Sequence, residues 1–308
     1  MDRFASSRIA VIGAGTIGVS WAAYFLARGY DVNVFDPLRP SDSIMRAIED
    51  LWPKLEQAGL WAGASLGRMQ VMADPGVAVE GAGFVQENGP EDEGAKIELF
   101  SVLDAAAPTT TVLASSSSGL LMSRIQSRCK HPERCVIGHP FNPPHLMPLV
   151  EVVAGEQTGE DAIVEAMAFY RKIGKHPIRI RKEVRGHIAN RLQAALWREA
   201  VHLVDTGVAS VADVDAAVAY GPGLRWAFMG PSLTFHLAGG DGGMQHFLEH
   251  LGEPVQSWWD DLGTPNLTPE IRQKLIEGVS AEADGRSVAD IARERDVFLA
   301  ALLKLLGH

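Results

Sequence analysis

Two residues of this chain, His139 and Glu151, have the types and the spacing of a proton-transferring pair. His139 follows an apolar, strand-like run at residues 135–138, and Glu151 stands inside the next apolar run at residues 149–153. A neutral imidazole takes a proton from a hydroxyl near pH 7, and a carboxylate on its other nitrogen orients the ring and favours the imidazolium that forms. The pair predicts a general base for alcohol oxidation, with His145 as the competing base. The alternative is a histidine at a strand end and a glutamate at a surface.

A glycine-rich turn near the N-terminus predicts a dinucleotide cofactor. An apolar run at residues 8–12 leads directly into this turn, and bulky side chains at helical spacing follow it. In a strand, turn and helix of this kind, the first glycine permits the tight turn, the second lets the backbone approach a pyrophosphate, and the third lets the helix pack on the strand. The predicted cofactor-binding residues of the turn are Gly13, Ala14, Gly15, Thr16, Ile17 and Gly18.

An acidic residue at the end of the second predicted strand favours NAD over NADP. Residues 32–35 form this strand, and Asp36 follows it. A carboxylate there accepts hydrogen bonds from both hydroxyls of the adenosine ribose and repels a 2′-phosphate. NADP stays an alternative because of Arg39, since a nearby arginine accommodates the 2′-phosphate.

Composition excludes several classes of protein. The 308 residues, 46% of them hydrophobic, are enough for two domains with large cores. The formal net charge is -10 and the basic residues form no cluster, which argues against binding to nucleic acid or an anionic membrane. The chain has no apolar run of about 20 residues, as a membrane span would need, and residues 1–7 lack the apolar core of a secretory signal. We therefore expect a cytoplasmic protein.

The two cysteines, Cys129 and Cys135, are too few for a disulfide framework. With only His131 between them they also make a poor metal site. We expect reduced thiols and no bound metal.

In the first half of the chain, segments of strand type alternate with segments of helix type. This alternation predicts a Rossmann domain with a mostly parallel, doubly wound sheet that binds ligands at the carboxyl ends of its strands. The run of serines at residues 115–118 and His139 both fall at such ends. Further strands are predicted at residues 69–72, 83–87, 111–114 and 177–180, and helices at 41–59, kinked at Pro53, and at 75–80, 96–103 and 118–127.

From residue 184 onward the apolar spacing is helical. Ser210 and Ser287 each precede a helix start signal, and Thr268 stands before Pro269 as an N-cap before a first-turn proline. We therefore expect an NAD-binding Rossmann domain at residues 1–183 and an all-α domain at residues 184–308.

The chain resembles the 3-hydroxyacyl-CoA dehydrogenase superfamily over nearly its whole length. After the glycine turn, the motifs V-Q-E-N-G-P-E, S-S-S-S-G-L, G-H-P-F-N-P-P-H-L-M-P-L-V-E-V and R-G-H-I-A-N-R-L follow in the expected order. The resemblance implies that His139 is the general base and Glu151 its carboxylate partner. It also implies that Ser118 and Asn190 bind the reacting part of the substrate and that Ser118 lies at the cofactor as well. The helical domain at residues 184–308 is then the substrate and dimerisation domain, and it forms a homodimer.

The same resemblance implies cofactor contacts for Glu91 and Lys96. Lys96 has an alternative interpretation as a solvated helix residue.

Within the superfamily, three segments resemble the branch that contains L-carnitine 3-dehydrogenase and L-gulonate 3-dehydrogenase, also known as lambda-crystallin: residues 194–200, 223–231 and 239–248. Enzymes of this branch use free acids. Arg225 is therefore a candidate to hold a substrate carboxylate through two parallel hydrogen bonds; an interdomain or dimer salt bridge is its alternative role.

We expect an NAD-dependent 3-hydroxy acid dehydrogenase that oxidises the 3-hydroxyl of a small carnitine-like or gulonate-like acid to the 3-keto acid. For a trimethylammonium group the candidate aromatic cage is Trp226, Phe228, Trp258 and Trp259, whose alternative roles are packing and dimer contact. The alternative functions are an L-3-hydroxyacyl-CoA dehydrogenase, a crystallin-like structural protein and a sensor that binds NADH without turnover.

Overall fold

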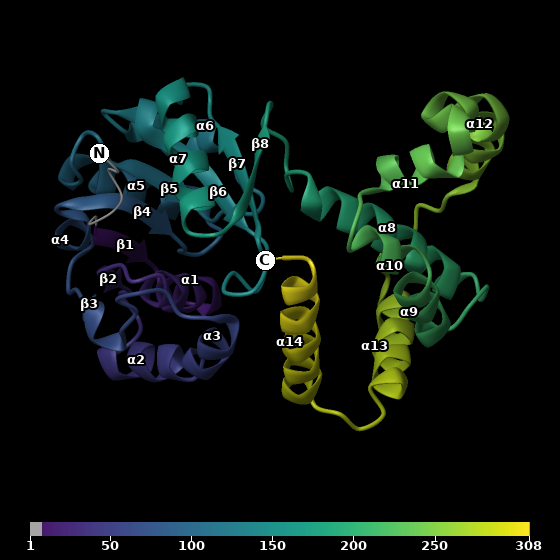
Figure 1. Cartoon of the computed structure of the whole chain (residues 1–308), viewed down its shortest axis with the longest axis horizontal. Coiled ribbons are helices and arrows are strands. Elements are labelled where there is room, and N and C mark those ends of the chain that lie inside the picture. The colour runs from purple at the N-terminus through teal and green to yellow at the C-terminus, as the bar shows by residue number, and fades with distance from the viewer. Residues whose placement is uncertain (1–7, 308) are drawn as a thin grey trace. The chain divides into compact units, whose positions relative to one another are not determined.

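The computed structural model describes residues 8–307. Within them the chain forms two compact units, which divide between Asn190 and Arg191 (Figure 1). Residues 1–7, on which the expected lack of a secretory signal rests, lie outside the described range. None of the described helices combines the length and the apolar character that a membrane crossing needs.

The first unit, which we call the NAD unit, contains an eight-stranded sheet in the order β3-β2-β1-β4-β5-β6-β7-β8. Neighbouring strands are parallel except β6 and β7, which are antiparallel. The predicted fold, a mostly parallel Rossmann sheet, is confirmed. The strands are β1 (Arg8–Ile12), β2 (Val32–Phe35), β3 (Met69–Val71), β4 (Ala82–Glu87), β5 (Val112–Ser115), β6 (Cys135–Pro140), β7 (Leu149–Ala154) and β8 (His176–Ile180).

The antiparallel pair has a physical cause in the chain between its strands. A parallel neighbour needs a crossover of about a dozen residues or more, usually a helix. The proline-rich segment at residues 141–148 is shorter than that and contains no helix. The chain therefore turns back on itself, and β7 runs against β6.

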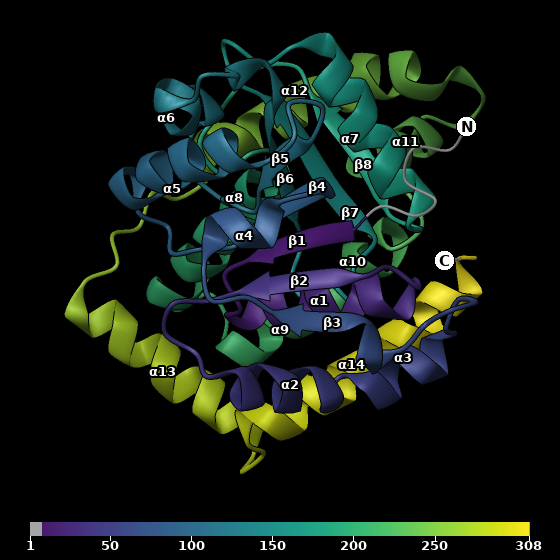
Figure 2. The same cartoon turned by 90° about the vertical axis from the view of Figure 1, so that its left-hand side faces the viewer.

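Helices cover both faces of this sheet. One apolar cluster packs α1 and α7 against one face, where Phe84 of the sheet stacks on Phe169 with ring centroids 4.0 Å apart. The other packs α4 and α5 against the opposite face (Figure 2). The helices are α1 (Thr16–Ala27), α2 (Ser41–Glu49), α3 (Trp52–Ala58), α4 (Pro75–Val79), α5 (Glu93–Ala106), α6 (Met122–Ile125) and α7 (Glu160–Lys172), with 3-10 turns at Leu66–Arg68, Gln126–Arg128 and Pro132–Arg134.

Two predicted helices of this unit are wrong in part. The segment at 41–59 is not one kinked helix but two, α2 and α3, because Pro53 lies in the first turn of α3 and helices tolerate proline there. The predicted helix at 118–127 begins only at Met122. The backbone N–H groups of Ser118 and Gly119 donate to a glutamate instead of starting a helix.

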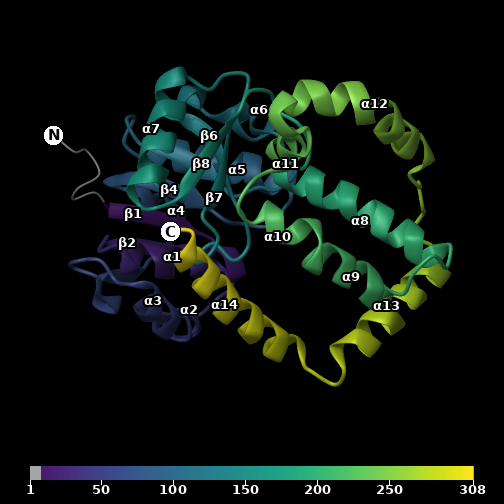
Figure 3. The same cartoon turned by 45° about the vertical axis from the view of Figure 1, so that its right-hand side comes forward.

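The second unit, which we call the helical unit, is all α within residues 191–307. The predicted helix starts are confirmed: Ser210, Thr268 and Ser287 each accept a backbone N–H three residues ahead. Figure 3 shows these helices and the loops that join them. They are α8 (Ala189–Asp205), α9 (Val211–Tyr220), α10 (Pro222–Trp226), α11 (Pro231–Ala238), α12 (Gly243–Asp261), α13 (Pro269–Ala283) and α14 (Val288–Leu305), with a 3-10 turn at Gly240–Gly242.

Candidate active site

His139 and Glu151 face each other across the antiparallel pair β6 and β7. Nδ1 of His139 lies 2.9 Å from Oε2 of Glu151, and both side chains are buried. Residues directly opposite in an antiparallel pair have neighbouring side chains. The reversal of β7 is therefore what brings together two residues that the sequence placed on successive strands.

Glu151 remains a carboxylate in this setting. Its Oε1 accepts the backbone N–H groups of Ile188 at 2.9 Å and Ala189 at 3.0 Å. Burial raises the pKa of Glu151, but the hydrogen bonds from His139, Ala189 and Ile188 outweigh burial and bring this pKa below its usual range. Because a carboxylate only accepts, Nδ1 of His139 carries the proton toward it. Nε2 is then the nitrogen that holds a lone pair.

The loop after β5, residues 115–119, is tied to Glu91. Oε1 of Glu91 accepts the Ser117 hydroxyl at 2.7 Å and the N–H groups of Ser118 at 3.0 Å and Gly119 at 2.7 Å. Burial raises the pKa of Glu91, but hydrogen bonds from Ser117, Gly119 and Leu120 and the charge of Lys96 lower it overall. We call residues 115–119 the serine loop.

The four serines of this loop divide into internal and exposed side chains. The Ser115 hydroxyl donates to Glu87 at 2.6 Å, and the Ser116 hydroxyl donates to Asn88 at 2.7 Å. Ser117 is buried on Glu91, whereas Ser118 is exposed, with its Oγ 3.5 Å from Oε1 of Glu91. Of the four, Ser118 is thus the one whose hydroxyl is open to a ligand.

Lys96 is buried in an ion pair. Its Nζ lies 2.6 Å and 2.9 Å from the two carboxylate oxygens of Glu87 and 3.1 Å from the Gly89 carbonyl. With 2% of its surface exposed, Lys96 is not the solvated helix residue of the alternative interpretation. Its contact with the cofactor stays a prediction. Glu87 was missed at the sequence level, although an acid ending a buried strand in V-Q-E-N-G-P-E is a signal that could have found it.

The glycine turn fits a dinucleotide. A Cβ on Gly13 would lie 2.8 Å from the backbone of Asn88, and one on Gly18 would lie 1.8 Å from the Gly13 carbonyl oxygen. Gly15, by contrast, has open space on that side, and as the N-cap of α1 it leaves the first amides of the helix without a side-chain cap. A backbone surface that is open at this glycine suits the approach of a pyrophosphate.

Asp36 is fixed beside this turn. Its Oδ2 accepts the Ala14 N–H at 2.7 Å, and its Oδ1 accepts the Leu38 N–H at 2.8 Å and the Arg39 N–H at 3.0 Å. The Arg39 guanidinium donates to the Ala14 carbonyl at 2.6 Å and lies 3.4 Å from the Ser43 hydroxyl. These three bonds use three of the roughly four acceptor sites of the carboxylate, and one site on Oδ2 has no partner among these bonds. The contact of Asp36 with a ribose stays a prediction.

The other predicted site residues lie in three different places. Asn190 is half-buried in the first turn of α8, two residues after the Ile188 amide that binds Glu151. Arg225 is exposed in the last turn of α10, in the helical unit. The competing base His145 is buried, with Nδ1 2.8 Å from the Ser20 hydroxyl, and its backbone N–H donates to the same hydroxyl.

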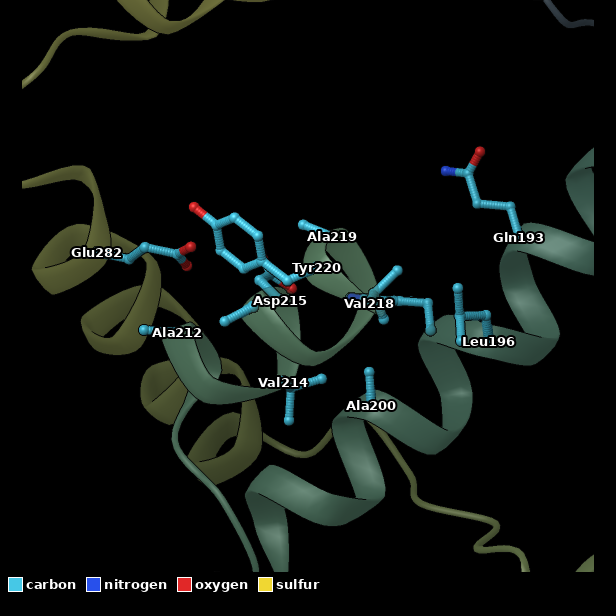
Figure 4. A pocket seen from close by; sticks show the side chains of 12 residues that line it. Gln193, Leu196, Ala200, Ala212, Val214, Asp215, Val218, Ala219, Tyr220 and Glu282 are labelled. Carbon is cyan, nitrogen blue, oxygen red and sulfur yellow. The ribbon is translucent and has the colours of Figure 1, made fainter. Parts of the chain in front are cut away.

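The helical unit has a pocket of about 540 Å³ between α8 and α9 (Figure 4). Its lining is apolar apart from Gln193, Asp215, Tyr220 and Glu282, and Trp197 adds a second aromatic ring. None of the four aromatic residues proposed for an ammonium cage lines it. Those four, Trp226, Phe228, Trp258 and Trp259, are exposed elsewhere on the unit.

Comparison with known proteins agrees with the fold and the turn. The model of the 3-hydroxyacyl-CoA dehydrogenase NAD binding domain matches residues 8–184, and the model of the C-terminal domain of the same enzymes matches residues 186–271. Together they span most of the chain.

Several similar proteins are L-carnitine dehydrogenases. The enzyme of Streptomyces coelicolor is 48% identical over 98% of this chain and 95% of its own length. That of Bacillus cereus is 44% identical over 99% of this chain and 94% of its own length. Among solved structures, 5-formyl-3-hydroxy-2-methylpyridine 4-carboxylic acid 5-dehydrogenase, described as an NAD+ dependent dismutase, matches with a TM-score of 0.81 at 30% identity and covers 98% of this chain and 99% of that one.

The chain belongs to the 3-hydroxyacyl-CoA dehydrogenase family. It is an NAD-dependent oxidoreductase with a Rossmann domain and a helical C-terminal domain.

Proposed function

We propose that this enzyme oxidises the 3-hydroxyl of L-carnitine to the 3-keto acid, with His139 as the general base. The observation that carries the chemistry is the buried His139–Glu151 pair in the same unit as the dinucleotide turn. The choice of substrate is supported by the relatives, which are L-carnitine dehydrogenases at 44–50% identity over nearly the whole chain.

In this proposal Nε2 of His139 takes the proton of the substrate hydroxyl, because Nδ1 is committed to Glu151. Glu151 offsets the positive charge that develops on the ring, and the backbone amides of Ile188 and Ala189 hold Glu151 in position. Bound NAD supplies the hydride acceptor at C4 of its nicotinamide. The Ser118 hydroxyl and the Asn190 amide bind the reacting part of the substrate, and Glu91 and Lys96 complete the cofactor site.

The helical unit supplies the group that binds the carboxylate end of the substrate. The exposed guanidinium of Arg225 pairs with the carboxylate in a bidentate geometry. A free acid rather than a CoA thioester is also favoured by the charge of α2 and α3, which carry Arg46 and Lys54 against Asp42, Glu49 and Glu56. This surface offers little attraction to CoA phosphates.

A homodimer is part of the same proposal. The helical unit exposes large apolar side chains on α9, α12 and α14, among them Tyr220, Trp258 and Phe298. Exposed apolar surface of this extent marks a surface that another molecule covers. The second copy of the chain is the partner that the family resemblance implies.

The test is NADH formation with L-carnitine, L-gulonate, 3-hydroxybutyrate and 3-hydroxybutyryl-CoA at matched concentrations. The highest kcat/KM with L-carnitine supports the proposal, and a clear preference for the thioester contradicts the free-acid assignment. NADH binding without turnover of any of the four would instead support the sensor or crystallin-like alternatives.

A further inference from the structure

His187 lies against the proposed catalytic pair, in the segment between β8 and α8. Its ring centroid is 5.0 Å from that of His139, with an angle of 48° between the planes. Only 1% of the His187 surface is exposed. Neither the proton transfer nor the cofactor site described above uses this side chain.

The side chain of His187 connects the serine loop to this region. Its Nε2 lies 3.0 Å from the Ser117 carbonyl oxygen. Because a carbonyl only accepts, Nε2 must carry the hydrogen, and in the neutral ring Nδ1 holds a lone pair. Nδ1 is buried and has no hydrogen-bond partner among the described residues. A proton there would have no acceptor.

The backbone of His187 has a second function. It adopts a left-handed conformation, with φ +51°, directly after Gly186 at φ +76°. Residues other than glycine adopt this conformation at an energetic cost, which persists when the surroundings require it. The next two amides, of Ile188 and Ala189, are the ones that donate to Glu151. The turn at His187 therefore aims this pair of donors at the carboxylate.

We propose that His187 is a positioning residue, which joins the serine loop to the His139–Glu151 pair and stays neutral so that Glu151 offsets the charge of His139 alone. This inference rests on the proposed role of His139. A charged His187 would place a second cation beside His139 and would compete for Glu151.

The surroundings of His187 shift its pKa in opposite directions. Burial lowers its pKa, the hydrogen bond to Ser117 raises it, and the charge of His139 on β6 lowers it. Glu151 on β7 and Glu91 beside the serine loop raise it by smaller amounts. The balance is a lowered pKa, in agreement with the neutral ring that the geometry requires.

The kinetic test compares His187→Phe with His187→Gln. Phenylalanine keeps a planar ring but loses the donor to Ser117, whereas the glutamine amide keeps a donor and does not titrate. We expect kcat for L-carnitine to fall about tenfold or more in His187→Phe, because a buried carbonyl loses its partner, and to recover most of that loss in His187→Gln. The affinity for NADH should stay unchanged in both. The control is His176→Gln, at an exposed histidine of β8.

Two kinetic results would overturn the inference. One is a His187→Phe enzyme whose kcat and KM lie within about twofold of the natural enzyme. The other is a His187→Gln enzyme that is no better than His187→Phe, since the donor to Ser117 would then have no role.

A second measurement needs neither a variant nor a substrate. In NMR spectra of the natural enzyme with isotope-labelled histidine, His187 should remain neutral with its hydrogen on Nε2 at a pH where exposed histidines are protonated. A ring that titrates with the exposed histidines, or that carries its hydrogen on Nδ1, contradicts the inference. If L-carnitine is not oxidised at all, the proposed substrate fails, while this measurement still tests the neutral His187 ring and its hydrogen bond to Ser117.

Discussion

The two units of this chain differ in where their apolar side chains lie. In the NAD unit they fill two clusters on opposite faces of the sheet, with Trp21, Phe25 and Phe84 fully buried. In the helical unit, large apolar side chains lie mainly on the surface, with Phe228 75% exposed and Leu305 83% exposed. Among the described residues, the buried hydrophobic side chains of the helical unit are Val201, Val211, Val214, Phe247 and Ile271.

This difference in burial corresponds to different proposed roles of the two units. The NAD unit has the burial that holds ionisable pairs such as His139–Glu151 and Lys96–Glu87 in fixed positions. The helical unit buries few of its described large apolar side chains, and burial of apolar surface is the main favourable term in folding. In the proposed function, the NAD unit holds the groups of proton transfer, and the helical unit supplies Arg225 to the substrate and an apolar surface to a second copy.

The largest expected effect comes from His139. In His139→Gln we expect kcat to fall by about 10² to 10⁴, the usual contribution of general-base catalysis. NADH affinity, measured by fluorescence titration, should not change because the glycine turn is untouched. His176→Gln serves as the control. Near-normal turnover in His139→Gln would remove the chemistry from this residue and leave His145 as the base to test.

A smaller effect is expected from Glu151→Gln. Without the carboxylate, the charge that develops on the His139 ring is no longer offset, so kcat should fall by about 10- to 100-fold. Steady-state kinetics with L-carnitine measures this change. Glutamine keeps an acceptor for the Ile188 and Ala189 amides, so the local fold should survive. A kcat within about twofold of the natural enzyme would show that Glu151 does not act through His139.

Arg225 tests the contribution of the helical unit. In Arg225→Ala we expect KM for L-carnitine to rise about tenfold, as for the loss of a charge-assisted hydrogen bond, while kcat changes less. Arg293→Ala is the matched control, since Arg293 pairs with Asp290 on the exposed side of α14. An unchanged KM would restrict substrate binding to the NAD unit and would support a salt-bridge role for Arg225.

Much of the NAD unit could be predicted from the sequence because its signals are local. The glycine turn and the acid at the end of β2 depend on a few neighbouring residues, and the structure has these elements where they were predicted. The approach of His139 to Glu151 was also predicted. Its cause was not, because strand direction depends on how the chain turns between residues 141 and 148.

The parts that could not be predicted depend on contacts between distant segments. Lys96 finds Glu87 only once α5 packs beside the end of β4, and His187 reaches Ser117 across 70 positions of the chain. The left-handed backbone of His187 also has no local signal, since glycine is the residue that usually marks it. The exposure of the helical unit could not be predicted either. The sequence of an apolar helix face is the same whether its own chain or another chain covers it.

The proposed homodimer gives a concentration-dependent prediction. If a second copy covers the apolar surface of the helical unit, the thermal midpoint should fall by a few degrees for each roughly tenfold dilution, since association stabilises by mass action. Phe298→Glu on α14, 67% exposed, should weaken this dependence and shift sedimentation toward the monomer. A midpoint that is independent of concentration, with a monomeric mass, contradicts the dimer.

The smallest expected effect concerns the acid stability of the NAD unit. The pKa of His187 is lowered from the ordinary 6.5 of a histidine, so below pH 6.5 the unfolded chain binds a proton that the folded chain does not. The stability from the neutral ring is therefore complete above pH 6.5 and is lost as the pH falls. The pKa values of Glu151 and Glu91 are lowered from the ordinary 4.5, so the stability that these two carboxylates contribute is lost only at lower pH.

As the pH falls below 6.5, the natural protein should thus lose stability that His187→Gln does not lose, because its unfolded chain binds a proton that its folded chain does not. Urea unfolding at several pH values measures the difference, and His176→Gln, at an exposed position, should follow the natural protein. Equal slopes for all three proteins would mean that His187 titrates normally in the folded state. A protonated His187 would then lie beside the charge on His139, because the packing of the NAD unit would not keep His187 neutral. The two units would differ only in how much apolar surface they bury.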